Sequence, residues 1–402
     1  MLKKSTIPLL AMVALLGTTP VANSAGELPS KEEMWKMLKQ QQEEINALKQ
    51  ILSIQKNEPV APAEPQNGEK KKDGLHWSDR ITLSGVVDVR ANAKKDYAKT
   101  RTSDIVIDTV KVNVDSKVTD LVSAHVTLLH EEAANGAGPE FVDVDEATIT
   151  LGDPDKFPAY LTAGRMTVPF GKFTTNLIND PLTLQLAETK ESVLQVGFNS
   201  EGFYGSGYAF NGNSQKAGHS DTIDQFGANL GFSGKLRNAT LDIGASYINS
   251  IEDSEVLSSS IPTLNAMSRH IGGAGVHAVL GFQGFTLIGE YITATDRFDN
   301  AEVAWNGRGA KPKVSNLELD YEFEIMGKTS IASLAWQSSD EALALGFPAN
   351  RIMTGLSMLI FDQTTVAVEW MHDKDYGTGS TATLPGTNTT ANTGTVKLAV
   401  GF

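Results

Sequence analysis

A two-residue alternation of apolar and polar residues recurs from Ile81 to Phe402, and it limits the fold more than any other feature. In the stretch ITLSGVVDVRA, the side chains of Ile81, Leu83, Val87 and Val89 share one face of an extended strand. Because successive side chains on a strand point to opposite faces, this period predicts strands with one apolar and one polar face. We expect sixteen strands, near 81–91, 104–119, 121–130, 142–152, 159–168, 193–199, 201–211, 224–234, 239–251, 272–283, 285–298, 312–327, 328–339, 347–362, 364–377 and 392–402.

The connections between these strands alternate between long and short. A long connection at 92–103 is followed by a short one near Asp120 and a long one at 131–141. Other short turns are expected near Gly234–Asn238, Gly284, Gly327 and Asp362. Long loops at one rim and tight turns at the other are typical of outer-membrane barrels. The predicted fold class is therefore all-β, a sixteen-stranded antiparallel transmembrane β-barrel over residues 81–402.

The stretch GTVKLAVGF (Gly394–Phe402) continues the alternation, with Val396, Leu398 and Val400 on the same face as Phe402. In a closed barrel the last strand pairs with the first, since an open edge in lipid leaves backbone groups unsatisfied. We expect this stretch to be the closing strand. It also resembles the C-terminal signature of outer-membrane proteins, which implies that the barrel-assembly machinery recognises Phe402.

The N-terminal residues have the order of a secretory signal peptide. Lys3 and Lys4 precede an apolar run at 7–16, and small residues follow as far as Ala25. The run is shorter than the roughly 20 residues that span a bilayer. We therefore interpret 1–25 as a signal peptide, with a membrane anchor as the alternative.

Residues 30–56 are predicted to form a helix. Leu38, Ile45 and Leu52 recur every seven residues, which is the spacing of a coiled-coil seam. A short coiled coil and a single surface helix both fit this pattern. The segment 57–80 is rich in proline and charge, so we interpret it as a linker before the barrel.

Composition excludes several classes of function. The chain has no cysteine and a formal charge of −14, which argue against thiolate chemistry and against nucleic acid as a partner. It lacks a GxSxG elbow and HExxH spacing. No catalytic residue, metal site or cofactor is predicted, and we expect that the protein is not an enzyme. A barrel phospholipase is the alternative in that class.

Charged residues mark the face of the wall that should line the pore. On the strand 312–327, four carboxylates alternate with apolar residues, and lipid does not accept such a row cheaply. This acidic row is Glu318, Asp320, Glu322 and Glu324. A basic sector is expected on the first, second and last strands, which become neighbours when the barrel closes. Its residues are Arg90, Lys111 and Lys397.

The third long connection, residues 169–192, is long and carries its own apolar side chains. In sixteen-stranded porins the third long loop folds into the barrel and sets the constriction, so we expect charges of this loop to form the pore constriction. The alternative is a loop that packs over the rim or against a neighbouring subunit. The predicted constriction residues are Lys172, Asp180, Glu188, Lys190 and Glu191, with Arg165 on the wall below.

The order of these features is informative as a whole. The signal peptide, the helix MWKMLKQQQEEINALKQ, the charged linker, and a barrel with GRMTVPFGKF and NDPLTLQLAET resemble the LbtU-type siderophore porin family. The resemblance covers essentially the whole chain and implies an outer-membrane barrel that admits a ferric siderophore. We carry over no ligand residues from the family.

The resemblance sets expectations for location and partners. We expect a porin in the outer membrane of a Gram-negative bacterium, in contact with its lipid, with the N-terminal helix in the periplasm. Passage of the siderophore is expected to be passive or facilitated, because energised receptors have a plugged 22-stranded barrel. A homotrimer is a further hypothesis. A porin for sugars or other small polar solutes and a structural tether to the cell wall are the alternatives.

Overall fold

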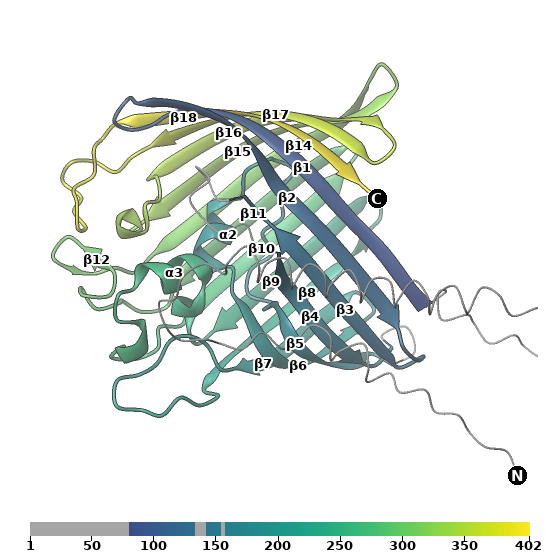
Figure 1. Ribbon diagram of the computed structural model, residues 1–402, viewed down its shortest axis with the longest axis horizontal. Helices are drawn as coiled ribbons and strands as arrows, with labels where there is room; N and C mark the ends of the chain where they lie inside the picture. The colour runs from purple at the N-terminus through teal and green to yellow at the C-terminus, as the bar shows by residue number, and fades with distance from the viewer. Residues whose placement is uncertain (1–79, 133–141, 154–156) are drawn as a thin grey trace, which may run out of the picture. The chain divides into compact units, whose positions relative to one another are not determined.

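The computed structural model describes residues 80–132, 142–153 and 157–402. These residues form a closed antiparallel barrel in which the first strand pairs with the last (Figure 1). All sixteen strands predicted from the alternation are present. They are β1 (Ile81–Lys95), β2 (Arg101–Lys117), β3 (Val122–His130), β4 (Asp143–Leu151), β5 (Ala159–Thr167), β6 (Lys190–Ser200), β7 (Phe203–Phe210), β8 (Gln225–Leu236), β9 (Ala239–Ile248), β10 (Gly273–Phe282), β11 (Phe285–Ala294), β14 (Lys313–Ile325), β15 (Lys328–Asp340), β16 (Asn350–Phe361), β17 (Thr364–Lys374) and β18 (Thr390–Gly401).

Short turns lie at one end of the barrel and long connections at the other, as the sequence predicts (Figure 1). Three of the short turns between barrel strands have positive φ at both central residues: Glu201-Gly202, Gln283-Gly284 and Met326-Gly327. Positive φ at both positions is the type I′ geometry, whose twist matches that of the flanking strands. The first long connection is shorter than expected, residues 96–100, because β1 and β2 extend past their predicted ends.

The barrel closes through backbone hydrogen bonds between β1 and β18. Arg90 pairs with Lys397 in this register, and Val86 pairs with Gly401. The seam ends at Gly85 and Phe402, whose N–H and C=O groups exchange hydrogen bonds of 2.9 and 3.0 Å. Because every strand has a partner on both sides, the barrel has no open sheet edge.

The outer surface of the barrel is apolar. On β14 the exposed residues Leu317, Leu319 and Tyr321 alternate with inward-facing polar ones, and other strands repeat this pattern. Exposed Trp336 and Trp370 stand toward the loop end of their strands. Aromatic residues at the borders of an apolar band are typical of membrane barrels. Among the described residues, no helix has both the length and the apolarity needed to cross a bilayer.

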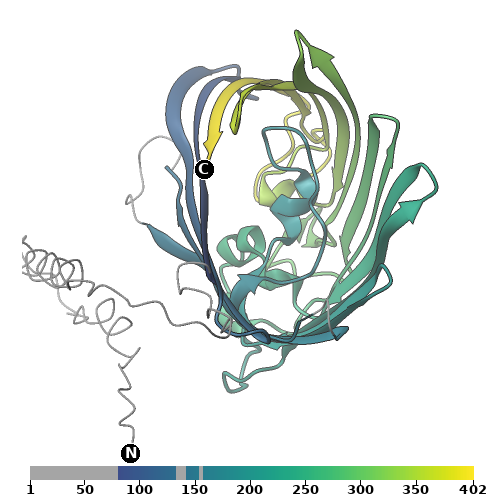
Figure 2. The same cartoon turned by 90° about the vertical axis from the view of Figure 1, so that its right-hand side faces the viewer.

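Several long connections fold into short helices, which the sequence did not predict. Figure 2 shows some of these segments within the ring of strands. Helices of six residues do not cover enough turns to show a periodic pattern, and packing stabilises them instead. They are α2 (Leu182–Ala187), η3 (Ile251–Asp253), α3 (Glu255–Ser260), η4 (Leu264–Ala266) and η5 (Leu343–Leu345), and the connection 295–312 holds the small hairpin of β12 (Ala304–Trp305) and β13 (Arg308–Gly309).

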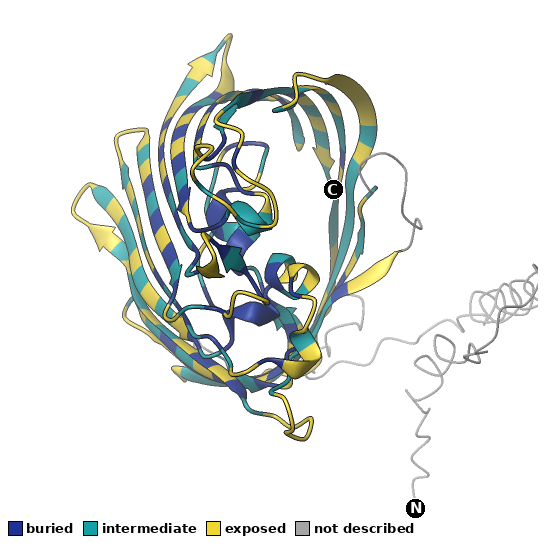
Figure 3. Ribbon diagram, turned by 90° about the vertical axis from the view of Figure 1, so that its left-hand side faces the viewer, coloured by how far each residue is buried: buried dark blue, intermediate teal, exposed yellow. Residues whose placement is uncertain are grey.

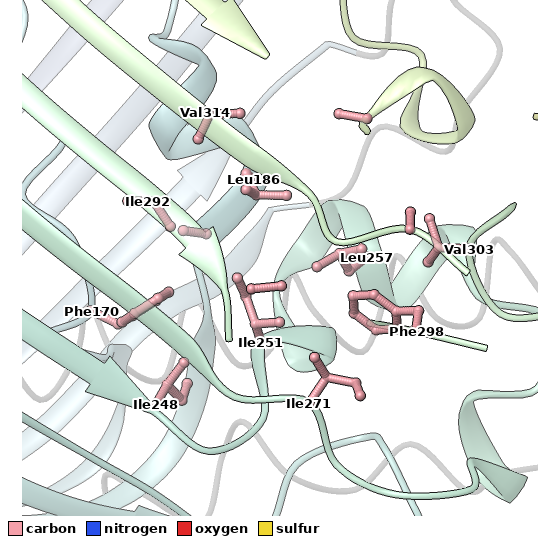
Figure 4. Packing of buried hydrophobic residues seen from close by; sticks show 14 of the residues in the cluster. Phe170, Leu186, Ile248, Ile251, Leu257, Ile271, Ile292, Phe298, Val303 and Val314 are labelled. Atoms are coloured by element: carbon pink, nitrogen blue, oxygen red, sulfur yellow. The ribbon is translucent and has the colours of Figure 1, made fainter. Parts of the chain in front are cut away.

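The long connections share an apolar core with the inner wall of the barrel. Leu186 of α2 and Leu257 of α3 are fully buried, and Ile251 lies with them in the same cluster (Figure 4). Ile248 and Ile292 contribute from the wall. Burial of each large aliphatic side chain stabilises this arrangement by about 1.5–3 kcal/mol. Figure 3 shows buried loop segments in dark blue within the ring of strands.

The predicted signal peptide, the helix 30–56 and the linker lie outside the described residues, apart from Arg80 at the end of the linker. These interpretations, with the coiled coil and the periplasmic position of the helix, stay predictions.

Candidate functional site

The connection between β5 and β6, residues 168–189, runs along the inner wall of the barrel (Figure 2). Near its start, the N–H of Gly171 donates to Ser246 Oγ of β9 at 3.1 Å. Near α2, the N–H of Leu182 donates to Gln337 Oε1 of β15 at 3.1 Å. The loop therefore lies inside the barrel, in contact with strands that are distant from β5 and β6.

Wall carboxylates hold the backbone of this loop. Glu290 of β11 accepts hydrogen bonds from the N–H groups of Lys172 at 2.6 Å and of Phe173 at 3.2 Å. Glu318 of β14 accepts one from the N–H of Asn176 at 2.7 Å. In each contact a main-chain N–H donates to a carboxyl oxygen at hydrogen-bond distance. The contacts therefore fix the loop through its main chain.

A third carboxylate holds the loop just before its tip. Glu369 of β17 accepts hydrogen bonds through Oε2 from the N–H groups of Ile178 at 2.5 Å and Asn179 at 3.2 Å. Its Oε1 accepts one from Asn179 Nδ2 at 2.6 Å. Three donors therefore meet one carboxylate that is only 6% exposed.

The acidic row on β14 faces the interior, but the loop divides it. Glu318 and Asp320 are buried, and Asn176 Nδ2 donates to Asp320 Oδ2 at 2.9 Å. Glu322 and Glu324, nearer the turn end, stay exposed. The sequence predicted that all four would face water. The difference arises because two of them bind the loop, which is a contact between distant parts of the chain.

Asp180 follows this anchored segment and forms the charged tip of the loop. Its side chain is exposed to the interior, although protein surrounds it on several sides. Burial raises the pKa of Asp180, and the positive charges of Arg90, Lys397 and Lys190 oppose that rise. Two residues of the basic sector, Arg90 and Lys397, are therefore among the charges that act on Asp180.

The basic sector is not a free row of cations. Each of its three residues lies beside an acidic partner from the same part of the wall. The pairs are Arg90 with Asp108 at 2.7 Å, Lys111 with Asp145 at 3.7 Å, and Lys397 with Asp88 at 3.8 Å. Carboxylates thus offset much of the positive potential that the sequence predicted on this side.

Lys190 lies at the centre of a charged cluster. Its Nζ is 2.9 Å from Asp145 Oδ1, 3.5 Å from Glu188 Oε1 and 3.7 Å from Glu255 Oε1. The cluster borders a cavity of about 690 Å³ that Arg165 also lines. Arg165 itself is exposed near the loop end of β5. The structure thus brings Arg165, Glu188 and Lys190 together.

The other two predicted constriction residues have different partners. Lys172 Nζ is 2.9 Å from Asp242 Oδ2 of β9, on a different part of the wall from Lys190. Glu191 is buried and accepts a hydrogen bond from Asn213 Nδ2 at 3.1 Å. Lys172, Lys190 and Glu191 therefore have partners on different parts of the wall, and the role of the six predicted residues in a constriction stays a prediction.

Sequence reasoning missed the wall residues that place the loop. Glu290 and Glu369 each lie on the inward face, between outward residues such as Val368 and Trp370. A single carboxylate on the polar face of an alternating strand was the available signal. The alternation shows which side of the wall such a carboxylate faces, but it does not show which group the carboxylate binds.

A second network joins two long connections outside the strands. His270 Nδ1 lies 2.8 Å from Glu252 Oε1, and its Nε2 lies 3.3 Å from Asp224 Oδ1. The hydrogen bond with Glu252 raises the pKa of His270. Burial raises the pKa of Glu252. The imidazole therefore links the connections 211–224 and 249–272 most strongly when it is protonated.

Comparison with known proteins gives distant relatives. No protein-family model matches the chain. A UPF0422 protein of Legionella pneumophila strain Lens is 27% identical over 319 residues, which cover 74% of this chain and 59% of the relative. A UPF0422 protein of Coxiella burnetii is 27% identical over 318 residues, which cover 77% of this chain and 67% of the relative. The chain thus matches about three-fifths of the length of the Legionella relative.

Solved structures share the fold at low sequence identity. An anion-selective porin from Comamonas acidovorans is 14% identical with a TM-score of 0.56, over 80% of this chain and 99% of the porin. The outer-membrane channel DcaP of Acinetobacter baumannii is 11% identical with a TM-score of 0.54, over 84% and 100%. Salmonella typhi OmpF is 12% identical with a TM-score of 0.53, over 82% and 99%. The chain therefore has the barrel fold of outer-membrane porins.

Proposed function

We propose that this protein is a passive channel of the outer membrane for small polar solutes. The observation that carries the proposal is the loop 168–189, which lies inside a closed barrel and carries the exposed charge of Asp180. An apolar exterior with a charged interior is the arrangement of a water-filled barrel. Solute would pass between the tip of the loop and the wall of β1 and β18.

The charges around this passage favour neutral or cationic solutes. Each cation of the basic sector has a nearby carboxylate, and Asp180 adds a negative charge without forming an ion pair among the described residues. Asp88, Asp108, Asp145 and Asp180 together outnumber the three cations of the basic sector. Rings of carboxylates select cations in channels. We therefore expect a weak preference for K⁺ over Cl⁻.

The sequence resemblance makes a ferric siderophore the specific solute of this proposal. Burial of Glu318 and Asp320 beneath the loop removes part of the acidic surface that would repel an anionic complex. The paired basic sector still offers no surplus of positive charge. The proposal therefore applies best to ferric siderophores whose net charge is zero or positive. Sugars remain the alternative solutes.

Planar-bilayer recording of the purified protein tests the proposal. Discrete conductance steps in KCl, with a reversal potential on the side of cation permeability, are expected. A neutral or cationic ferric siderophore should block these steps, whereas its iron-free form and a polyanionic ferric complex serve as matched controls. Steps that only sugars block would favour the alternative. A purified, heat-modifiable barrel without any conductance would reject the channel.

A homotrimer and recognition of Phe402 by the assembly machinery also belong to this proposal. Three conductance levels that close in sequence would support the trimer. Loss of membrane insertion in a Phe402→Ala variant would support the recognition of Phe402.

A further inference from the structure

We infer that Glu369 is a positioning residue that sets the ion selectivity of the channel by holding the tip of the loop 168–189. The inference rests on the proposed channel function. Glu369 accepts hydrogen bonds from the main chain of Ile178 and Asn179 and from the side chain of Asn179. Asp180 is the next residue along the chain. The position of its charge therefore depends on the contacts of Glu369 before it, together with the hydrogen bond from the N–H of Leu182 to Gln337 after it.

The observed arrangement of donors suits a carboxylate. Both oxygens of Glu369 accept hydrogen bonds, and the groups that face it are donors. A glutamine whose oxygen faces the two main-chain N–H groups would direct its amide hydrogens toward Asn179 Nδ2, and its neutral oxygen would accept the main-chain hydrogen bonds more weakly. An unmatched buried amide destabilises the contact by the loss of at least one hydrogen bond. The tip would then leave the wall, although the rest of the barrel would keep its strands.

Other carboxylates attach the earlier part of the loop to the wall. Holding the loop inside the barrel is therefore a separate role from holding its tip. Glu290 holds Lys172 and Phe173, and Glu318 holds Asn176. These contacts keep the loop inside the barrel when Glu369 is changed. The expected effect of Glu369 is therefore local to the tip, and it should appear in selectivity more than in the presence of conductance.

A double-mutant cycle on reversal potentials tests the inference. Asp180→Asn should lower the K⁺/Cl⁻ permeability ratio by about sixfold, because one unit charge roughly 8 Å from the ion path in water acts with opposite sign on K⁺ and Cl⁻. Glu369→Gln should shift the ratio in the same direction in the wild-type background and have no further effect in the Asp180→Asn background. An equal shift in both backgrounds would show a direct effect of the Glu369 charge and overturn the inference.

Two further variants complete the design. Glu369→Asp keeps the negative charge but withdraws the carboxylate by one methylene, so it should reproduce the shift of Glu369→Gln. Asp362→Asn removes the same charge from the turn before β17, where the residue is exposed. It should leave the ratio unchanged. Wild-type selectivity in Glu369→Asp would count against a positioning role.

A spectroscopic measurement separates this inference from the channel proposal. The chain has no cysteine, so Asp180→Cys provides a single site for a nitroxide spin label. The label should give a broad spectrum with Glu369 present and a narrower, more mobile one in the Glu369→Gln background. This result is obtained whether or not the barrel conducts. Identical spectra in the two proteins would overturn the inference even if the barrel is a channel.

Discussion

Reversal of the charge at the tip of the loop should change the ion preference of the barrel. Asp180 is exposed, and the positive charges of Arg90 and Lys397 act on it. The change Asp180→Lys alters the local charge by two units. At roughly 8 Å in water, each unit charge contributes about 0.5 kcal/mol to the energy of a passing ion. Because the charge acts with opposite sign on K⁺ and Cl⁻, the energy difference between the two ions changes by about 2 kcal/mol, or about thirtyfold in the K⁺/Cl⁻ permeability ratio, toward chloride.

Reversal potentials in a KCl gradient measure this ratio directly. The shift should be largest at low salt and shrink strongly at 1 M KCl, where the Debye length is roughly 3 Å. Glu201→Lys makes the same charge change at the turn between β6 and β7 and should leave the ratio near that of the wild type. An unchanged ratio in Asp180→Lys at low salt would refute the placement of Asp180 beside the ion path.

Three other changes test the seam between β1 and β18, the contacts of His270 and the apolar core of the long connections. Gly85→Val should lower the free energy of unfolding by about 1–3 kcal/mol, because a Cβ at Gly85 would lie 2.5 Å from the ring of Phe402. A heat-modifiability gel at increasing temperatures measures the change, and unchanged melting would contradict it. The raised pKa of His270 means that its ion pairs with Glu252 and Asp224 are complete below pH 6.5 and are lost as pH rises through the raised value. Because Asp224 belongs to the connection 211–224, protease cleavage of that connection should increase with pH in the wild type but not in His270→Gln. Trp305→Ala should destabilise the loop core by about 3–5 kcal/mol and expose it to protease, which a thermal melt and digestion would measure.

The strands and their faces could be read from the sequence because both depend on local spacing. The alternation around Leu317 and Leu319 shows which side of β14 meets lipid, without knowledge of any other strand. Pairs of residues such as Met326-Gly327 likewise mark a turn from two adjacent positions. These properties are local, so the number and direction of strands followed from the sequence.

The arrangement of the interior could not be read in the same way. Glu318 and Asn176 are 142 positions apart in the chain, and Glu369 and Ile178 are 191 apart. Nothing in the local pattern distinguishes a carboxylate that faces water from one that accepts hydrogen bonds from a distant loop. The sequence therefore placed Glu318 on the correct side of the wall but did not predict its burial.

The pairing of β1 with β18 has a consequence for the order in which the barrel forms. Val86 and Gly401, roughly 300 positions apart, are neighbours in this seam. Contacts between such distant residues form slowly, because the intervening chain loses much of its conformational freedom. The hairpins between consecutive strands form over far shorter separations. The strand that is synthesised first is therefore completed last, and its free edge has to be shielded until the opposite end of the barrel arrives.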